Sequence, residues 1–233
     1  MSFPARKIAV HGRPSAVPYQ WRHLSSGGTY PVAALPPRRF RFLLKTPALP
    51  PPNVPIQILT AGGTIDKLYF DAKSEYEVGE PQIGEILREA GVTADYDVEV
   101  VLRKDSLEMT DADRCTLVRR ATDAEAQHVL ITHGTDTMVL TARALREALA
   151  GDGDMPTKTV VLVGSLSPAR FKASDAVFNI GFAMAAAQTL SPGVYIAMNG
   201  QVFRPEEVRK NAEANRFERA GNASEAATSP EER

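Results

Sequence analysis

The stretch HVLITHGTDTMVLTARALREALAG, residues 128–151, contains a strand, a turn and a helix in direct succession. Residues 128–132 are almost all apolar and rich in β-branched side chains, which favours a buried strand. Residues 133–137 form the turn, and residues 138–150 then favour a helix, which Gly151 would stop. A buried strand that leads directly into a helix is the repeating unit of a parallel α/β sheet.

The same alternation continues in both directions along the chain. It predicts an α/β fold: an open, doubly wound, mostly parallel sheet with helices on both faces and right-handed crossovers. Thr110 is the expected N-cap of the second helix. The predicted strands cover residues 54–59, 96–102, 128–132, 159–163 and 194–198, and the predicted helices cover residues 83–90, 111–125, 138–150 and 175–190.

The two ends of the chain differ from this alternating pattern. Residues 1–53 hold ten prolines and no acidic residue, and we predict a disordered Pro/Arg-rich extension. An organelle transit peptide is a second interpretation of that segment. Beyond about residue 212 the chain is rich in Ala, Glu, Asn and Ser, which predicts a frayed helix and a disordered tail over residues 218–233. The folded domain is therefore expected at residues 54–217.

Composition and charge exclude several classes of protein. Eight basic residues precede Asp66, the first acidic one; the remaining chain has 19 basic and 28 acidic residues, a net charge of −9. Such an acidic domain argues against nucleic-acid binding. No apolar run approaches the roughly 20 residues that cross a bilayer. The single cysteine, Cys115, excludes an internal disulfide and a Cys-rich metal site, and we expect it to be buried on a helix.

Polar side chains follow four of the predicted strands, where ligands bind in a sheet of this kind. They are Thr64, Asp105, Ser106, Thr135, Asp136, Ser165 and Ser167. The turn at Gly62 and Gly63 exposes backbone N–H groups that can hold an oxyanion, and its spacing matches neither nucleotide-binding glycine motif. A hydroxyl directly after such a turn, that of Thr64, suits attack on a carbonyl carbon.

A threonine nucleophile needs a group that accepts its proton. His128 and His133 are interpreted as structural residues, because one opens a strand and the other precedes a turn. Lys210 can act as a base only if burial lowers its pKa. Composition alone favours a solvated helical position for Lys210.

The motifs are more specific than these individual residues. ILTAGGTI, residues 58–65, resembles the first signature of bacterial-type L-asparaginases, and HGTDTM, residues 133–138, resembles the second. The segments SEYEVG (74–79), DSLEM (105–109), MN (198–199) and VRK (208–210) are also similar. The resemblance covers residues 54–217 and implies a short, single-domain form of the family, without the smaller second domain of most members.

The resemblance implies hydrolysis of the side-chain amide of L-asparagine, through an acyl-threonine intermediate and without a cofactor or metal. It implies catalytic roles for Thr64, Tyr76, Thr135, Asp136 and Lys210, and substrate contacts from Ser106, Leu107, Thr135 and Asp136. Tyr76 would lie on a lid over residues 65–79. Leu107 and Ala61 replace residues that are polar in many members, which leaves the choice between asparagine and glutamine open.

Two other hypotheses remain at this stage. An amidase component acting on misacylated tRNA would release ammonia only with charged tRNA. A non-catalytic relative would be stabilised by aspartate without turning over. For the asparaginase hypothesis we expect a cytoplasmic homodimer or homotetramer with a small-molecule substrate and no membrane partner.

Overall fold

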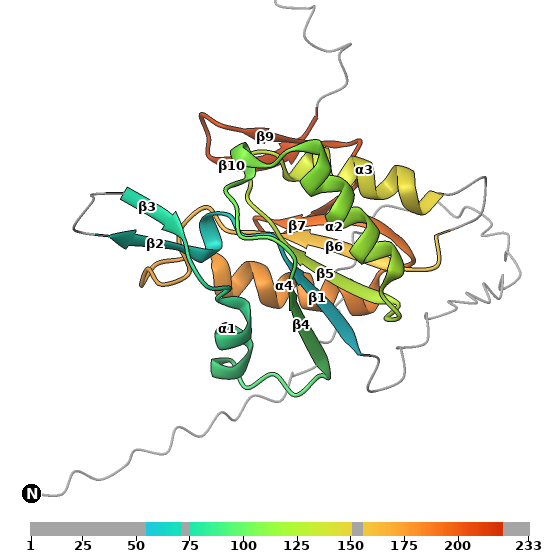
Figure 1. Cartoon of the computed structure of the whole chain (residues 1–233), viewed down its shortest axis with the longest axis horizontal. Helices are drawn as coiled ribbons and strands as arrows, with labels where there is room; N and C mark the ends of the chain where they lie inside the picture. The colour runs from blue at the N-terminus through green and yellow to red at the C-terminus, as the bar shows by residue number, and fades with distance from the viewer. Residues whose placement is uncertain (1–54, 71–74, 151–155, 221–233) are drawn as a thin grey trace, which may run out of the picture. The chain divides into compact units, whose positions relative to one another are not determined.

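The computed structural model describes residues 55–70, 75–150 and 156–220. Their centre is a six-stranded sheet of order β4-β1-β5-β6-β7-β8 (Figure 1). Five strands are parallel, and β8 pairs antiparallel with β7. The strands are β1 Ile56–Thr60, β4 Tyr96–Val100, β5 His128–Thr132, β6 Thr159–Val163, β7 Gly193–Met198 and β8 Gln201–Phe203.

The predicted sheet is confirmed in class and in each of its five predicted strands, whose ends shift by two residues at most. The central strands are buried along their length, as continuous apolar runs require when both faces of a sheet are covered. Strand β8 was not predicted. A two-residue turn joins it to β7, with positive φ at Asn199 (53°) and Gly200 (71°), as a tight hairpin requires.

Four helices cover the sheet: α1 Ile83–Glu89, α2 Asp111–Asp123, α3 Met138–Ala150 and α4 Ala176–Thr189. Helices α2 and α3 pack against each other in front of the sheet, while α4 lies behind it (Figure 1). Helix α1 shares an apolar groove with α4, lined by residues such as Leu87 and Ile180, so it covers the same face as α4.

One crossover departs from the predicted handedness. The steps β5 to β6 and β6 to β7 run in the same direction across the sheet, but their helices, α3 and α4, lie on opposite faces. The β6–α4–β7 crossover therefore has the opposite hand from the other three, and the prediction of uniform right-handedness is wrong. Helix α3 already packs against β7 on its own face, and α4 instead covers β5, β6 and β7 from behind.

Two hairpins extend from the sheet. The first pairs β2 Lys67–Phe70 with β3 Glu75–Val78, within the segment predicted as a lid. The second pairs β9 Val208–Asn211 with β10 Arg216–Arg219. Over β10 the sequence predicted a frayed helix and, from residue 218, disorder; this is wrong for β10 because Phe217, about 1% exposed, anchors the strand as Val208 anchors β9. The extension predicted for residues 1–53 and the rest of the predicted tail, residues 221–233, lie outside the described residues.

Helix α2 shows one confirmed and one failed prediction. Thr110 caps it within a reciprocal capping box with Asp113. Cys115 is exposed, not buried. The buried residues of α2 are Leu117 and Ala121, and Cys115 lies two positions from Leu117, on nearly the opposite side of the helix.

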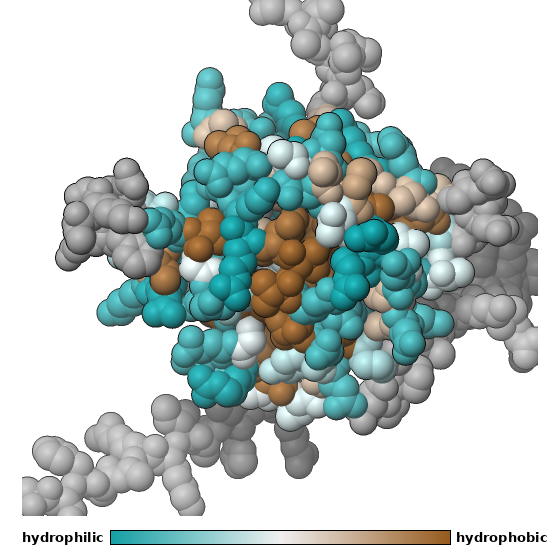
Figure 2. Space-filling view, in the orientation of Figure 1, coloured by the Kyte–Doolittle hydropathy of each residue, from teal (hydrophilic) through white to brown (hydrophobic). Residues whose placement is uncertain are grey.

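Apolar residues are exposed on the surface near the β4 edge of the sheet. Figure 2 shows apolar residues near the middle of this face, in the region of β1 and β4 in Figure 1, with hydrophilic side chains around them. Val100 at the end of the edge strand β4 is 44% exposed. Among the described helices, none is long and apolar enough to span a membrane.

Candidate active site

The loops that follow β1, β4 and β5 meet through two glycines. A Cβ atom on Gly63 would lie 2.4 Å from the Cα of Gly134, and a Cβ atom on Gly134 would lie 2.6 Å from the side chain of Ser106. Gly63 also has a φ of 100°, which favours glycine. These contacts place Thr64 and Thr135, each the next residue in the chain, on two loops that touch.

The topology of the sheet explains why the loops meet here. The chain leaves β1 toward β4 on one side, and β5 pairs with β1 on the other. Ligands bind at such a switch point, outside the carboxyl ends of the strands. The hydroxyl of Thr137 donates to the carbonyl of Ser106 over 2.8 Å, which ties the β4 and β5 loops together.

Lys210 reaches this point from the second hairpin. Its Nζ donates to Thr135 Oγ1 over 2.8 Å and forms an ion pair with Asp136 Oδ1 over 2.6 Å. The lysine side chain is 17% exposed, on strand β9 and not on a solvated helix. The structure thus joins three of the predicted site residues in one hydrogen-bonded group.

Asp105 links that group to the β4 loop electrostatically. Burial raises its pKa, but hydrogen bonds from Lys67 and the Leu107 N–H, and the charges of Lys67 and Lys210, lower the pKa overall. The Lys67 Nζ lies 2.5 Å from Asp105 Oδ2. An ionised Asp105 therefore interacts with two ammonium groups, one from each hairpin.

Ser106 and Thr64 offer hydroxyl groups at the same edge. Ser106 is about 1% exposed, and its Oγ has no hydrogen-bond partner among the described residues. Thr64 is half-buried and begins a short 3-10 turn, Thr64–Asp66. The β4 loop thus offers a buried hydroxyl without a partner among the described residues, and the β1 loop offers a half-buried one.

Tyr76 and Leu107 lie farther out, around an adjoining cleft. The cleft has a volume of about 420 Å³, and Lys67, Arg103, Asp105 and Glu108 also line it. Tyr76 is half exposed, and its ring centre lies 5.2 Å from that of Tyr69 and 6.4 Å from that of Phe171. Thr64, Thr135 and Lys210 do not line this cleft; Asp105 connects it to them.

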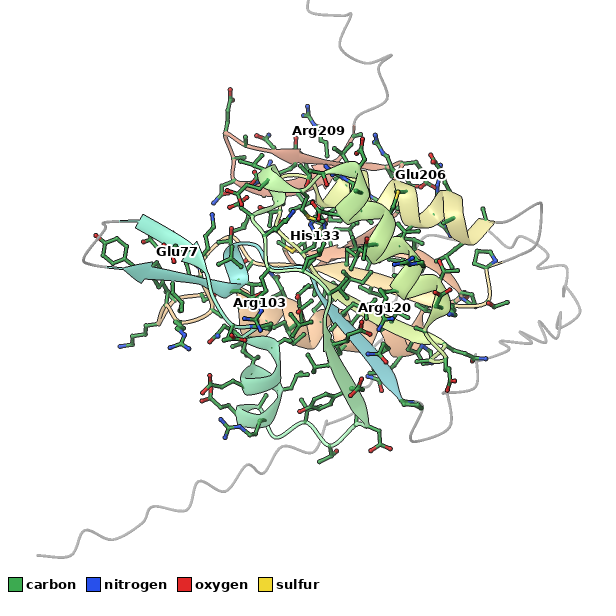
Figure 3. All side chains as sticks on the ribbon, in the orientation of Figure 1. Glu77, Arg103, Arg120, His133, Glu206 and Arg209 are labelled. Atoms are coloured by element: carbon green, nitrogen blue, oxygen red, sulfur yellow. The ribbon has the colours of Figure 1, made fainter. Side chains whose placement is uncertain are left out.

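Three other polar residues of the strand ends serve the fold. Ser165 donates to the carbonyl of Ser167, and the backbone N–H groups of Leu166 and Ser167 donate to Asp175. His133, at the centre of Figure 3, contacts the Gly134 carbonyl and the Thr141 hydroxyl, and burial lowers its pKa to about 4. A neutral, fully buried His133 is structural, in agreement with the sequence interpretation.

Sequence reasoning missed the environment of Asp66 and the pairing of Lys67. Asp66 was interpreted as one of the charges of the lid, yet it is only 2% exposed. Its carboxylate Oδ1 accepts from the backbone N–H of Gln82 over 2.8 Å. A charged residue next to a glycine turn carries no signal of burial by itself, because the partner is a backbone group 16 residues later.

The fold and the site define a class: an open α/β domain whose switch point carries threonine hydroxyls, a carboxylate and a lysine. Within that class the chain belongs to the asparaginase family, because the model described as "Asparaginase, N-terminal" matches residues 55–225.

Individual relatives agree with this assignment. The chain is 34% identical to L-asparaginase 2 of Escherichia coli over 70% of its own length and 47% of the relative's. It is 30% identical to a glutamyl-tRNA(Gln) amidotransferase subunit of Archaeoglobus fulgidus, over 69% and 40%. Its structure is similar to that of a probable cytoplasmic L-asparaginase from Campylobacter jejuni, with a TM-score of 0.59, 28% identity and coverage of 71% and 52%. The chain thus spans about half the length of these relatives.

Proposed function

We propose that this protein hydrolyses the side-chain amide of L-asparagine to L-aspartate and ammonia. The observation that carries the proposal is the group formed by Thr135, Asp136 and Lys210, next to the contact between Gly63 and Gly134. A hydroxyl that accepts a hydrogen bond from an ammonium group beside a donor-rich turn is suited to acyl transfer.

In the proposed mechanism Thr64 is the nucleophile. Its Oγ attacks the amide carbon, its proton passes to the amide nitrogen, the C–N bond breaks, and the nitrogen leaves as ammonia. Water then attacks the acyl-threonine ester and releases aspartate and the free hydroxyl. Backbone N–H groups of the Gly62–Gly63 turn and of the loop at Thr135 are suited to hold the negative oxygen in each step.

The neighbouring residues have assigned roles in this proposal. Asp136 accepts from the substrate ammonium group, and the buried hydroxyl of Ser106 donates to its carboxylate. Lys210 holds Thr135 and moves protons through it. Tyr76 covers the reacting ester from the hairpin, and the apolar Leu107 lines the substrate side.

The remaining expectations belong to the same proposal. Residues 54–217 form the catalytic domain, and the protein acts in the cytoplasm as a homodimer or homotetramer. The Campylobacter jejuni relative, whose description includes the word cytoplasmic, supports the location.

A second candidate is an amidase component that acts on misacylated tRNA. The Archaeoglobus fulgidus relative, part of an amidotransferase, favours it. The net charge of −9 after residue 65 opposes it, because RNA binding requires positive charge.

Ammonia release tests these alternatives with the purified full chain. Asparagine and glutamine are supplied side by side, with and without aminoacylated tRNA. We expect release from free asparagine, independent of tRNA. Release only with charged tRNA would favour the second candidate, and thermal stabilisation by aspartate without any release would identify a binding protein.

A further inference from the structure

Asp66 joins both ends of the β2–β3 hairpin. It closes the 3-10 turn that begins at Thr64, and its backbone carbonyl accepts from the N–H of Gly79 over 2.8 Å. Its carboxylate accepts from the N–H of Gln82 over the same distance. Gly79 and Gln82 lie where the hairpin returns to the domain and α1 begins. A single residue thus connects the entry and the exit of the hairpin.

The same residue belongs to a network that supports Tyr76. The side chain of Gln82 accepts from Arg170 Nε over 3.0 Å, and the carbonyl of Ile65 accepts from the N–H of Ala169 over 3.1 Å. These bonds hold the loop after β6 against the turn. That loop carries Phe171, whose ring contacts the ring of Tyr76.

The carboxyl group of Asp66 is in an unfavourable environment. Burial raises its pKa to about 6, while the Gln82 N–H and the charge of Arg103 lower it. Arg103, near the start of α1 in Figure 3, is itself paired with Glu80, and Lys67 is paired with Asp105. The second carboxyl oxygen of Asp66 has no hydrogen-bond partner among the described residues. A neutral side chain would be more stable here, so the acid calls for a functional explanation.

We propose that Asp66 is a positioning residue that couples the β2–β3 hairpin, and with it Tyr76, to the turn that carries Thr64. This inference rests on the proposed function. The ionised carboxylate makes a charge-assisted hydrogen bond to Gln82, which is stronger than the bond that a neutral group would make. The raised pKa shows that burial nevertheless favours the neutral carboxyl in the closed hairpin, so protonation near pH 6 tightens the hairpin, and slower opening of the hairpin slows turnover.

The test compares the full-length wild type with Asp66→Asn, which keeps the shape and one acceptor but cannot ionise. Asp97→Asn is the control, because Asp97 is exposed on β4 and bonds only to Gln57 among the contacts described. Ammonia release from asparagine is measured between about pH 5 and pH 8. Hydrogen exchange of peptides that cover β2 and β3 is measured over the same range.

We expect the wild-type kcat to fall roughly several-fold as the pH drops through about 6 and then to level off at the rate of the uncharged variant. Asp66→Asn should lower kcat several-fold at neutral pH with a smaller change in KM, and its profile should lack the inflection. Hairpin protection should rise with acidification in the wild type and in the control, but should stay at the higher level throughout in Asp66→Asn. Identical profiles and protection in all three proteins would overturn the inference.

The two proposals fail separately. If the wild type releases no ammonia at any pH, the proposed function fails and hydrogen exchange alone decides the role of Asp66. A hairpin whose protection changes near pH 6 only when Asp66 is present supports the coupling. Protection that is insensitive to Asp66 refutes it, whatever the activity.

Discussion

Two buried ionisable residues, Asp66 and His133, affect the pH dependence of stability in opposite directions. The pKa of Asp66 rises from 3.8 to about 6, so its contribution to stability is complete below pH 3.8 and is lost as the pH rises through 6. The pKa of His133 falls from 6.5 to about 4, so its contribution is present above pH 6.5 and is lost as the pH falls through 4. Each shift of about two units corresponds to about 3 kcal/mol. The two slopes therefore nearly cancel in the wild type.

Asp66→Asn should remove the contribution of residue 66 to the pH dependence of the free energy of unfolding. We expect the variant to be more stable than the wild type at pH 7, by up to about 3 kcal/mol, because no buried charge remains at residue 66. Its stability should then decrease on acidification through the window from 6.5 to 4, since His133 is uncompensated. Urea unfolding across that window measures both effects. A variant whose stability parallels the wild type at every pH would show that Asp66 is not buried in solution.

Lys210 should matter for activity and little for stability. Its partner Asp136 is 39% exposed, and ion pairs of this kind contribute about 0–1 kcal/mol. Lys210→Met should lower kcat by about 10²-fold or more, because a proton-transfer group is lost. Lys172→Met, which changes an exposed lysine after β6, is the control. A melting temperature that collapses together with the activity would instead assign Lys210 a structural role.

At the level of single residues, the sequence predicted which side chains gather but not what surrounds them. Thr135, Asp136 and Lys210 were grouped from two motifs far apart in the chain, and the structure brings them within hydrogen-bond distance. The burial of Asp66 was missed. Burial depends on what packs over a residue, and here the cover comes from segments that begin more than ten residues later.

Among the secondary-structure elements, the caps of α2 illustrate what local sequence can specify. Thr110 and Asp113 lie within one turn of each other, so their capping box was predictable. The other end is held by Lys158, which donates to the carbonyls of Ala121, Thr122 and Ala124. That contact joins residues more than 30 positions apart and has no local signal.

Thr110→Ala should destabilise the protein by about 1 kcal/mol, because the N–H of Asp113 loses its acceptor at the start of α2. Thr116→Ala on the same helix is the matched control. Within the described part of the chain, the Thr116 hydroxyl bonds only back to the carbonyl of Ala112, so alanine there should be neutral or slightly stabilising. Thermal unfolding of both variants checks the difference. Equal effects would mean that the capping box contributes nothing.

The second hairpin shows why short strands escape prediction. Each strand has four residues and one buried apolar side chain, too few for a periodic pattern. Its position depends on Asn199, in the turn between β7 and β8, whose side chain accepts from the N–H of Phe217 over 2.8 Å. Lys210 could therefore be identified by motif, but its strand could not.

Across the whole molecule, the layered sheet was predictable and the path of one helix was not. The fold class and the five parallel strands follow from apolar runs and their spacing, whereas the order of the strands in the sheet comes from the structure. The face that α4 covers is decided by packing, and general handedness rules give the wrong answer for it. The switch point between β1 and β5 is unaffected, and the loops that carry Thr64 and Thr135 touch there.

The central claim is that Thr64 and Thr135 act on the same amide in one site. The most direct test is the rate of ammonia release from asparagine for Thr64→Ala, Thr135→Ala and the double variant, with Thr116→Ala as the control. Residues that act as a unit are not additive. Each single variant should therefore lose at least about 10²-fold in kcat. The double variant should be little slower than the less active of the two single variants. Single variants that keep rates within a few-fold of the wild type, or losses that multiply in the double variant, would contradict the account.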